Sequence, residues 1–173
     1  MKFNLGCGND YKEEYHNCDY SRLVKIDEYV DLEEDLRWRD DIASEILVYH
    51  VLEHINNFIP LVHELYRISR KDGIIKIKTP FYSSWGQFND PTHVRFFTPF
   101  TFNYFNLGNY SHEAGSNKKM FEIKVKINYG IGVSSCLNWL MNPIINLNHL
   151  VYCRLFAWII PSSEIEYELK VLK

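Results

Sequence analysis

The chain opens with Lys2-Phe-Asn-Leu-Gly-Cys-Gly-Asn9, and this short apolar run stopped by two glycines decides the fold. Such a run predicts a buried strand that ends in a tight turn. In an open α/β sheet, ligands bind beyond the carboxyl ends of the strands. Gly6 and Gly8 would let a ligand approach the backbone without meeting a Cβ, and the turn amides could donate to an anionic group. A Gly-x-Gly sequence taken alone is more often a simple turn.

Further apolar or alternating runs predict six more strands. The compact run Glu45–Tyr49 is typical of a strand covered on both faces, which favours parallel pairing. The last two runs alternate apolar and polar residues and should have one wet face. The predicted strands are Lys2–Leu5, His16–Tyr20, Glu28–Leu32, Glu45–Tyr49, Ile74–Lys78, Glu122–Ile127 and Glu164–Leu169.

Two longer helices are predicted between these strands, and Thr98-Pro99 would cap a short helix through Phe105. Asn57 is a plausible N-cap for a helix that ends near Arg70, and Asn142-Pro143 would begin an apolar helix that runs to Ile160. Before residue 45 the links between strands are too short for full crossover helices. We therefore expect one α/β domain spanning 1–173. Its fold would be a Rossmann-like open twisted sheet, mostly parallel with an antiparallel strand near one edge, and with abbreviated helices in the N-terminal half.

Composition excludes several functional classes. The chain has 173 residues, 19 basic and 22 acidic side chains and a net charge of −3, so it lacks the basic footprint of a nucleic-acid-binding protein. The four cysteines form no Cys-x-x-Cys pair and join no histidines at zinc-site spacing, so we expect no metal and a reduced, cytoplasmic protein. No signal peptide or membrane-spanning segment is recognisable, so stable membrane insertion is not expected.

Carboxylates and histidines follow the predicted strands. Asp19 ends the second strand and could accept hydrogen bonds from two ribose hydroxyls. It lies only 11 residues after Gly8 and the third glycine is missing, which argues against a nicotinamide dinucleotide. Asp35-Leu36 follows the third strand, and His50 follows the fourth. Asp19 and Asp35 could also be solvated loop carboxylates.

These features occur together with several motifs, and in them the chain resembles the class I S-adenosylmethionine-dependent methyltransferases, especially small bacterial and archaeal members that open with the same Leu-Asn-Leu-Gly-Cys-Gly type of sequence. The resemblance covers most of the chain. The motifs, in chain order, are Asn4-Leu-Gly-Cys-Gly-Asn9, His50-Val-Leu-Glu-His54, Glu64-Leu-Tyr-Arg-Ile68, Lys71-Asp-Gly73 and Asp90-Pro-Thr-His93.

The resemblance implies a seven-stranded sheet with S-adenosyl-L-methionine lying across the first four strand ends. By matching position, Gly6, Cys7 and Gly8 would border its methionine part and Asp19 its ribose. Asp35 and Leu36 would border the adenine, and His50 the sulfonium side. The remaining assigned cofactor-binding positions are Asn4, Leu5 and Tyr20. Glu53 and His54 are interpreted as structural.

The aromatic segment Phe81–Tyr110 directly follows the fifth predicted strand and is the expected acceptor wall. His93 is the candidate general base, with Asp90 orienting it. Arg95 could hold an acceptor carboxylate or phosphate, and Tyr82 is assigned to the same wall. The alternative is a capped turn at Asp90-Pro91, a histidine that satisfies backbone groups, and aromatic residues that form a satellite core.

The predicted function is therefore methyl transfer from S-adenosyl-L-methionine to a small-molecule or sugar (glycan) acceptor by O- or N-methylation. The alternative is a catalytically silent protein that binds this cofactor or its demethylated product as a sensor or partner subunit. A nicotinamide-dependent oxidoreductase is a third hypothesis. The apolar segment 143–160 favours internal packing or a homodimer contact, and a membrane-surface role would suit a lipid-linked glycan acceptor.

Overall fold

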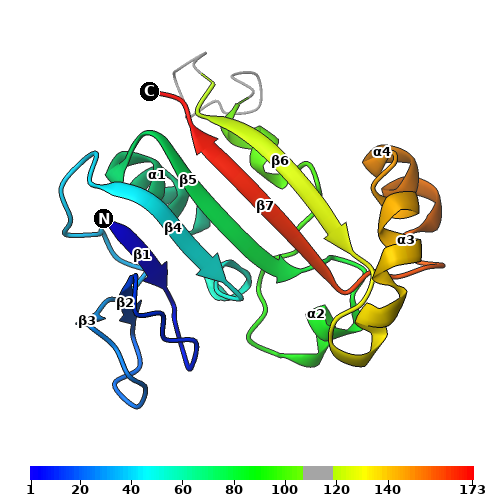
Figure 1. Ribbon diagram of the computed structural model, residues 1–173, viewed down its shortest axis with the longest axis horizontal. Coiled ribbons are helices and arrows are strands. Elements are labelled where there is room, and N and C mark those ends of the chain that lie inside the picture. The colour runs from blue at the N-terminus through cyan, green and yellow to red at the C-terminus, as the bar shows by residue number, and fades with distance from the viewer. Residues whose placement is uncertain (107–118) are drawn as a thin grey trace.

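A computed structural model describes residues 1–106 and 119–173, whose seven strands form one sheet in the order β3-β2-β1-β4-β5-β7-β6 (Figure 1). The first five strands pair in parallel, and β7 runs antiparallel to both β5 and β6. This arrangement confirms the predicted fold class. The strands are β1 (Lys2–Leu5), β2 (His16–Asp19), β3 (Glu28–Tyr29), β4 (Ala43–Tyr49), β5 (Ser69–Pro80), β6 (Phe121–Asn128) and β7 (Glu164–Val171).

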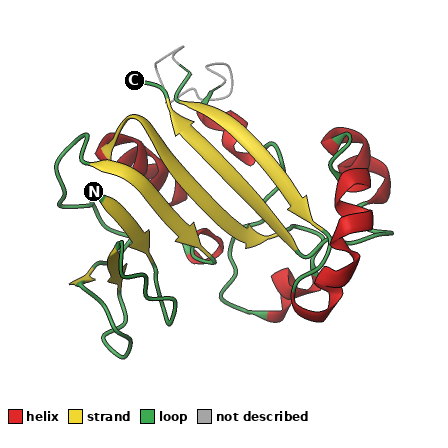
Figure 2. Ribbon diagram, viewed as in Figure 1, coloured by secondary structure: helices red, strands yellow, loops and turns green. Residues whose placement is uncertain are grey.

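The N-terminal strands are joined by loops without helices, whereas abbreviated helices were predicted there. Within the described residues, the first helical turn is η1 (Leu52–His54), and Figure 2 shows β1, β2 and β3 linked by loops alone. Asn17 holds the first of these loops: its side-chain amide donates to the carbonyl oxygens of Lys12 and Tyr15, and its Oδ1 accepts from the Lys12 amide at 2.9 Å. A buried asparagine thus orders a link that is too short for a helix.

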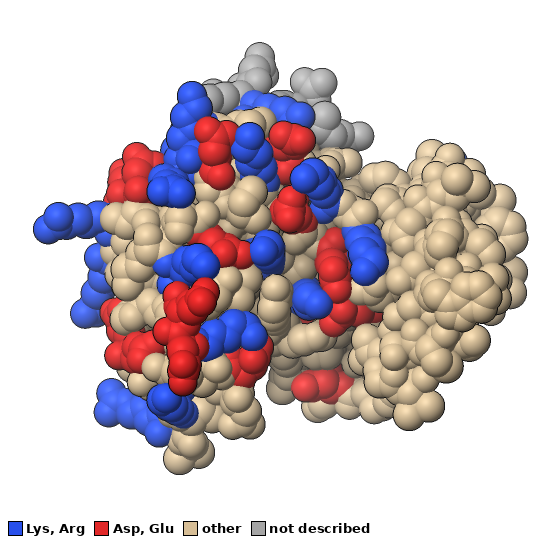
Figure 3. All heavy atoms as spheres, in the orientation of Figure 1, with Lys and Arg blue, Asp and Glu red and all other residues tan. Residues whose placement is uncertain are grey.

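The two faces of the sheet differ. Helix α1 (Phe58–Ile68) lies behind the sheet in Figure 1 and buries Leu61, Leu65 and other apolar side chains. The viewed face has no helix over its centre, and its lysines and glutamates form cross-strand ion pairs (Figure 3). These pairs are Lys76–Glu45 at 2.6 Å, Lys78–Glu166 at 2.9 Å and Lys124–Glu168 at 3.0 Å.

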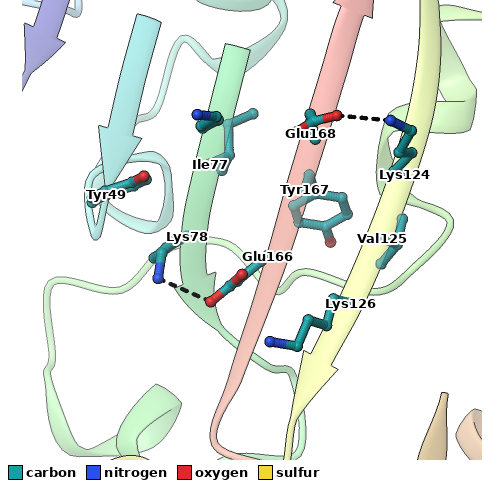
Figure 4. A pocket seen from close by; sticks show the side chains of 10 residues that line it. Tyr49, Ile77, Lys78, Lys124, Val125, Lys126, Glu166, Tyr167 and Glu168 are labelled. Carbon is teal, nitrogen blue, oxygen red and sulfur yellow. Dashed lines mark hydrogen bonds and ion pairs between the residues drawn. The ribbon is translucent and has the colours of Figure 1, made fainter. Parts of the chain in front are cut away.

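The prediction that Glu45–Tyr49 is covered on both faces holds only for the centre of the strand, where Ile46, Leu47 and Val48 are all buried. Glu45 pairs with Lys76 on the open face, and Tyr49 borders a shallow hollow of about 290 Å³ there (Figure 4). The alternation of isoleucine and lysine in β5 reflects the same division, because Ile75 and Ile77 are buried on the opposite side.

Several strands and helices begin or end at other residues than predicted. Strand β3 ends at Tyr29 rather than Leu32, and β2 ends at Asp19. The helix predicted to end near Arg70 ends at Ile68, and β5 begins at the next residue. The remaining short helices on the acceptor side are α2 (Trp85–Asn89) and the 3₁₀ turn η2 (Thr101–Phe105).

The single helix predicted from Pro143 to Ile160 was wrong. Residues 132–156 instead form the 3₁₀ turn η3 (Gly132–Leu137), α3 (Asn138–Ile145), α4 (His149–Val151) and a π turn, η4 (Tyr152–Phe156). Pro143 lies inside α3 rather than in its first turn. Asparagines interrupt the helical path: Asn148 accepts from the Val151 amide and begins α4, while Asn142 accepts from the amide of Tyr129 just beyond β6.

This helical arm, residues 131–160, is rich in exposed apolar side chains. Val133, Trp139, Leu147 and Ile159 are all highly exposed. Figure 3 shows the arm at the right as a surface almost without charged residues. None of the described helices has the length and apolar character needed to cross a bilayer.

The outer edge of β6 carries two asparagine side chains. Asn106 Oδ1 accepts from the Phe121 amide at 2.9 Å, and its Nδ2 donates to the Phe121 carbonyl oxygen at 2.7 Å. Asn146 makes the same two contacts with Ile127, at 2.7 Å and 2.8 Å. Each asparagine therefore occupies the position that a peptide group of a neighbouring strand would take.

Candidate functional site

A cavity of about 710 Å³ lies at the carboxyl ends of β1, β2 and β4. This is the edge at which open α/β sheets bind their ligands, and the volume suits a ligand of nucleoside size. Loops that are distant in sequence form its wall, which consists of Gly6, Gly8, Asp19, Tyr20, Ser21, Val30, Asp31, Leu32, Glu33, His50, Val51, His54, Ile55, Asp90 and Thr92.

The two glycines of the first turn adopt left-handed backbone conformations, with φ of 64° at Gly6 and 50° at Gly8. A Cβ at Gly6 would lie 2.3 Å from Val51 Cγ2, which is impossible without movement. A Cβ at Gly8 would meet nothing within 4 Å, because this residue faces open space in the cavity wall. Gly6 is thus required by close packing, whereas Gly8 leaves room for a ligand.

Asp19 connects the ends of the first two strands. Its Oδ2 accepts from the Gly8 amide at 2.8 Å, and its Oδ1 accepts from the Ser21 amide at 2.8 Å. The side chain is buried but borders the cavity, and each carboxylate oxygen retains a further lone pair. Tyr20, the next residue, is exposed and belongs to the same wall.

Three other assigned positions lie beneath the turn rather than in the cavity wall. The Asn4 amide donates to the Asp10 carbonyl oxygen and to Asn17 Oδ1, and Leu5 is fully buried in the core. Cys7 Sγ lies 3.8 Å from the Lys25 carbonyl oxygen, and burial raises the pKa of its thiol. These side chains shape the turn, and the structure does not bring them to the cavity.

The loop after β3 meets the cavity earlier than predicted. Asp35 is exposed outside the wall, while Leu36 is buried and its amide donates to Glu64 Oε2. Because β3 stops at Tyr29, Asp31 and Glu33 reach the wall instead. The sequence showed an acidic cluster in this loop but not which carboxylate faces inward.

The two carboxylates of this loop have different surroundings. Glu33 accepts from the Asn56 and Asn57 amides at the start of α1, which holds its pKa below the ordinary value although burial opposes this. Asp31 accepts from the Glu33 amide and is exposed, so it can also meet a ligand.

His50 bridges two buried carboxylates at the end of β4. Its Nε2 lies 3.1 Å from Glu164 Oε2, and its Nδ1 lies 3.5 Å from Glu53 Oε1. Glu164 and then Glu53 stabilise the imidazolium and raise the pKa of His50 to about 9. The backbone φ is 55°, an uncommon value for a residue with a side chain. His50 is thus held as a cation in the cavity wall, half exposed.

The partner that orients His93 differs from the prediction. His93 Nδ1 lies 3.0 Å from the Gln87 carbonyl oxygen, whereas Asp90 Oδ2 lies 3.9 Å from its Nε2, too far for a hydrogen bond. Asp90 binds Thr92 instead, through the amide at 2.9 Å and the hydroxyl at 2.6 Å. The prediction that Asp90 orients His93 was therefore wrong.

His54 is the residue that the sequence analysis missed. It borders the cavity, and its ring stands edge-on to the His93 ring, with centroids 4.7 Å apart. His93 is largely buried beside it and is not in the wall. The contact depends on the turn at Asp90–Thr92 folding back onto η1, which short-range sequence patterns do not encode.

The two residues assigned to acceptor binding donate to backbone carbonyl oxygens, and neither belongs to the cavity wall. The Tyr82 hydroxyl donates to the Cys153 carbonyl oxygen at 2.8 Å, and burial first of all raises its pKa to about 12. Arg95 Nε donates to the Ile55 carbonyl oxygen at 2.7 Å, and its Nη2 donates to that of Asn56. Both side chains tie loops together.

The aromatic segment after β5 is partly core. Phe81, Phe97, Phe102 and Phe105 are buried, whereas Trp85 and other aromatic residues are exposed. The last part of the predicted acceptor wall, residues 107–110, lies outside the described residues. These buried aromatic residues belong to the main core of the protein rather than to a satellite core.

Several solved methyltransferase structures have a fold similar to that of this chain. An S-adenosylmethionine-dependent methyltransferase from Archaeoglobus fulgidus has a TM-score of 0.67 and 17% sequence identity, and the match covers 98% of this chain and 85% of that one. The chain has the class I methyltransferase fold. A Thermotoga maritima methyltransferase, described as a possible histamine N-methyltransferase, has the same fold at a TM-score of 0.60 and 14% identity, with 99% and 82% coverage.

The class I methyltransferase fold does not decide the reaction by itself. The [4+2]-cyclase SpnF matches with a TM-score of 0.60 and 12% identity, covering 99% of this chain and 75% of SpnF. No family model and no curated protein matches the chain. Function must therefore be argued from the cavity.

Proposed function

We propose that this chain binds S-adenosyl-L-methionine in the cavity at the ends of β1, β2 and β4 and transfers its methyl group to an acceptor. One observation carries the proposal: two left-handed glycines and the Asp19 carboxylate converge on one cavity at the carboxyl edge of a class I methyltransferase fold. The neighbours described as S-adenosylmethionine-dependent methyltransferases support this choice of cofactor.

The cavity wall fits the parts of this cofactor. Asp19 can accept from ribose hydroxyls while it holds the glycine turn, and Gly8 leaves space beside the turn. Val30, Leu32 and Ile55 offer an apolar surface for a purine ring, and Asp31 offers a carboxylate at the same rim. These residues replace Asp35 and Leu36 in the proposed adenine-binding region.

The bound cofactor supplies a methyl group on a sulfonium, and the protein has to align the acceptor and exclude water. His50, fixed between Glu53 and Glu164, keeps one corner of the cavity rigid. An acceptor hydroxyl must also lose a proton, and the neighbouring imidazoles of His54 and His93 are suited to that task near neutral pH. His93 remains the proposed base, acting beside His54.

The acceptor proposed is a small molecule or a sugar of a glycan, methylated on oxygen or nitrogen. The polar rim formed by Asp90, Thr92 and His54 supports a hydroxylated acceptor, because these side chains offer both donors and acceptors. A cytoplasmic location, a single domain and a homodimer contact through the helical arm stay proposals.

The test is thermal unfolding of the full chain with S-adenosylhomocysteine or with NAD. We expect S-adenosylhomocysteine to raise the melting temperature in a concentration-dependent manner and NAD to leave it unchanged. Stabilisation by NAD alone would replace this proposal with the nicotinamide hypothesis. Methyl transfer is then assayed with labelled cofactor on a panel of sugars and small hydroxylated or amino compounds.

A second candidate is a protein that binds the cofactor or its demethylated product without transferring a methyl group. The short helix-free links after β1 and β2 favour it, because they leave the cofactor region less enclosed. SpnF has a similar fold and is named as a [4+2]-cyclase rather than a methyltransferase. Tight binding of S-adenosylhomocysteine without turnover on any acceptor would favour this candidate.

A further inference from the structure

We propose that Glu53, His54 and His93 together bind one divalent transition-metal ion at the rim of the cavity. One ligand atom from each of the three residues lies within 4.8 Å of the others. Two imidazoles and one carboxylate form a donor set that suits Zn²⁺, Mn²⁺ or Fe²⁺. The sequence analysis expected no metal, because the spacing of 39 residues between the two histidines hides the cluster.

Hydrogen bonds prepare both histidines for this role. His93 Nδ1 must carry its proton, because the Gln87 carbonyl oxygen 3.0 Å away can only accept. His54 Nδ1 lies 2.8 Å from Thr92 Oγ1, whose own hydrogen goes to Asp90 Oδ1 at 2.6 Å, so His54 donates there. In its neutral form, each ring therefore has Nε2 free to bind a metal ion. Metal-binding histidines are commonly held in this way, with the second ring nitrogen donating to an oxygen.

Glu53 supplies an independent observation. Only 1% of its surface is exposed, and Thr79 Oγ1 donates to Oε2 at 3.1 Å. Its Oε1 has no hydrogen-bond donor in the described part of the chain, although His50 Nδ1 approaches to 3.5 Å. The His50 imidazolium offsets part of the charge of Glu53 but makes no hydrogen bond to Oε1, and a metal ion in direct contact would give this oxygen the partner it lacks.

The geometry requires a small closing movement. Two atoms bound to one ion at about 2.1 Å can be at most about 4 Å apart, so a 4.8 Å separation must shrink by roughly 1 Å. Rotation of the His54 and Glu53 side chains can bring the ligand atoms together by this distance. The His50 imidazolium beside Glu53 weakens the attraction for a cation, so we expect moderate rather than extreme affinity.

A metal here would have a function at the acceptor side. His54 borders the cavity, so the coordination positions not filled by protein face the space that Asp90 and Thr92 also line. An acceptor hydroxyl would bind there and lose its proton more readily, so the metal would take over the role proposed for His93, whose Nε2 would then be occupied. This role rests on the proposed function, whereas the metal site itself does not.

A second cluster with similar residue types does not qualify. His16 Nε2 lies 2.8 Å from Glu28 Oε2, which also accepts from the Trp38 indole at 3.1 Å. Burial raises the pKa of the Cys18 thiol in the same cluster. The Glu28 carboxylate already has hydrogen-bond donors, and the Cys18 thiol is held protonated. This cluster therefore serves as an internal control.

The experiment titrates the chelator-treated full chain with Zn²⁺ by calorimetry and with Co²⁺ by visible absorption, without any cofactor. We expect one equivalent to bind and Co²⁺ to give a d–d absorption band. His54→Ala, His93→Ala and Glu53→Gln should each weaken Zn²⁺ binding at least roughly tenfold. His16→Ala and His63→Ala, which alter histidines outside the cluster, should bind as the wild type does.

The proposal is overturned if the wild type binds no metal, or if the cluster variants bind it as tightly as the control variants. Glu53→Gln keeps the side-chain shape, and thermal unfolding shows which variants are folded. Thr92→Val changes no ligand but removes the acceptor that fixes the His54 proton, so it should also weaken Zn²⁺ binding. Unchanged binding in a folded Thr92→Val would count against the proposal. Binding of S-adenosylhomocysteine is measured separately, so the two proposals fail independently.

Discussion

Gly6 and Val51 approach each other so closely that a Cβ at position 6 would lie 2.3 Å from Val51 Cγ2. Gly6→Ala therefore combines a clash with a left-handed backbone that disfavours any side chain. We expect a loss of unfolding free energy of about 3 kcal/mol or more, measured by urea denaturation.

Gly8→Ala is the matched control for this change. Its φ is also positive, but its Cβ would meet nothing within 4 Å, so only the backbone cost of about 1–2 kcal/mol should appear. Adding Val51→Ala to Gly6→Ala should recover part of the loss, because it removes the clashing atom. Equal losses for the two glycine variants would contradict this account of the turn.

Asp19→Ala should weaken S-adenosylhomocysteine binding roughly tenfold to a hundredfold, measured by calorimetry. This corresponds to about 1.5–3 kcal/mol for lost hydrogen bonds to a carboxylate. The change also releases the Gly8 and Ser21 amides, so the melting temperature should fall as well.

The control for Asp19 is Asp35→Ala, which alters an exposed carboxylate outside the cavity wall. Its affinity for S-adenosylhomocysteine should match the wild type. If Asp35→Ala weakened binding as much as Asp19→Ala, the cavity would not be the cofactor site. Asp31→Ala, inside the wall, should show an intermediate loss.

Arg95→Lys tests whether this residue holds the acceptor or the fold. Lysine keeps the charge but cannot reach the carbonyl oxygens of Ile55 and Asn56 with the same fork of donors. We expect about 1–3 kcal/mol lower unfolding free energy and an unchanged KM for an active acceptor. A raised KM with normal stability would restore the acceptor-binding interpretation.

Acid should weaken the link between α1 and the loop after β3. Arg67 donates to Glu64 at 2.7 Å and lowers the pKa of that carboxyl in the folded chain. Glu64 therefore stabilises the fold above its unfolded pKa, and this stabilisation is lost as the pH falls through its lower folded value. Urea midpoints between pH 7 and pH 3 should fall less in Glu64→Gln than in the wild type. Parallel curves would contradict this.

The sequence predicts the sheet well because its signals are local. Lys2–Gly8 shows a buried strand and a glycine turn in adjacent residues, and the structure has both. The Asp19 carboxylate at a strand end could likewise be anticipated. The segment 143–160 could not, because Asn142 and Asn146 bind the backbone of β6 and its following turn, and no local pattern reveals that contact.

Tertiary contacts also explain the errors at the site. Arg95 and Tyr82 have residue types suited to an acceptor, but carbonyl oxygens brought close by folding bind them instead. His54 was interpreted as a capping or packing residue because it begins a predicted helix, and its contact with His93 is not visible in the sequence. Local sequence patterns therefore predicted the strands and the glycine turn more reliably than they predicted which atoms each side chain contacts.

The asparagines at the outer edge of β6 limit how this protein can associate. An unpaired strand edge normally invites another chain to extend the sheet, the route to many aggregates. Asn106 and Asn146 block the Phe121 and Ile127 positions, and among the described residues this leaves the outward backbone groups of Ile123 and Val125 open between them. Two residues offer an incoming strand few backbone partners, and the neighbouring Lys126 adds like-charge repulsion between identical edges. Growth of the sheet into ribbons or fibrils is thus blocked at this side by two amide side chains.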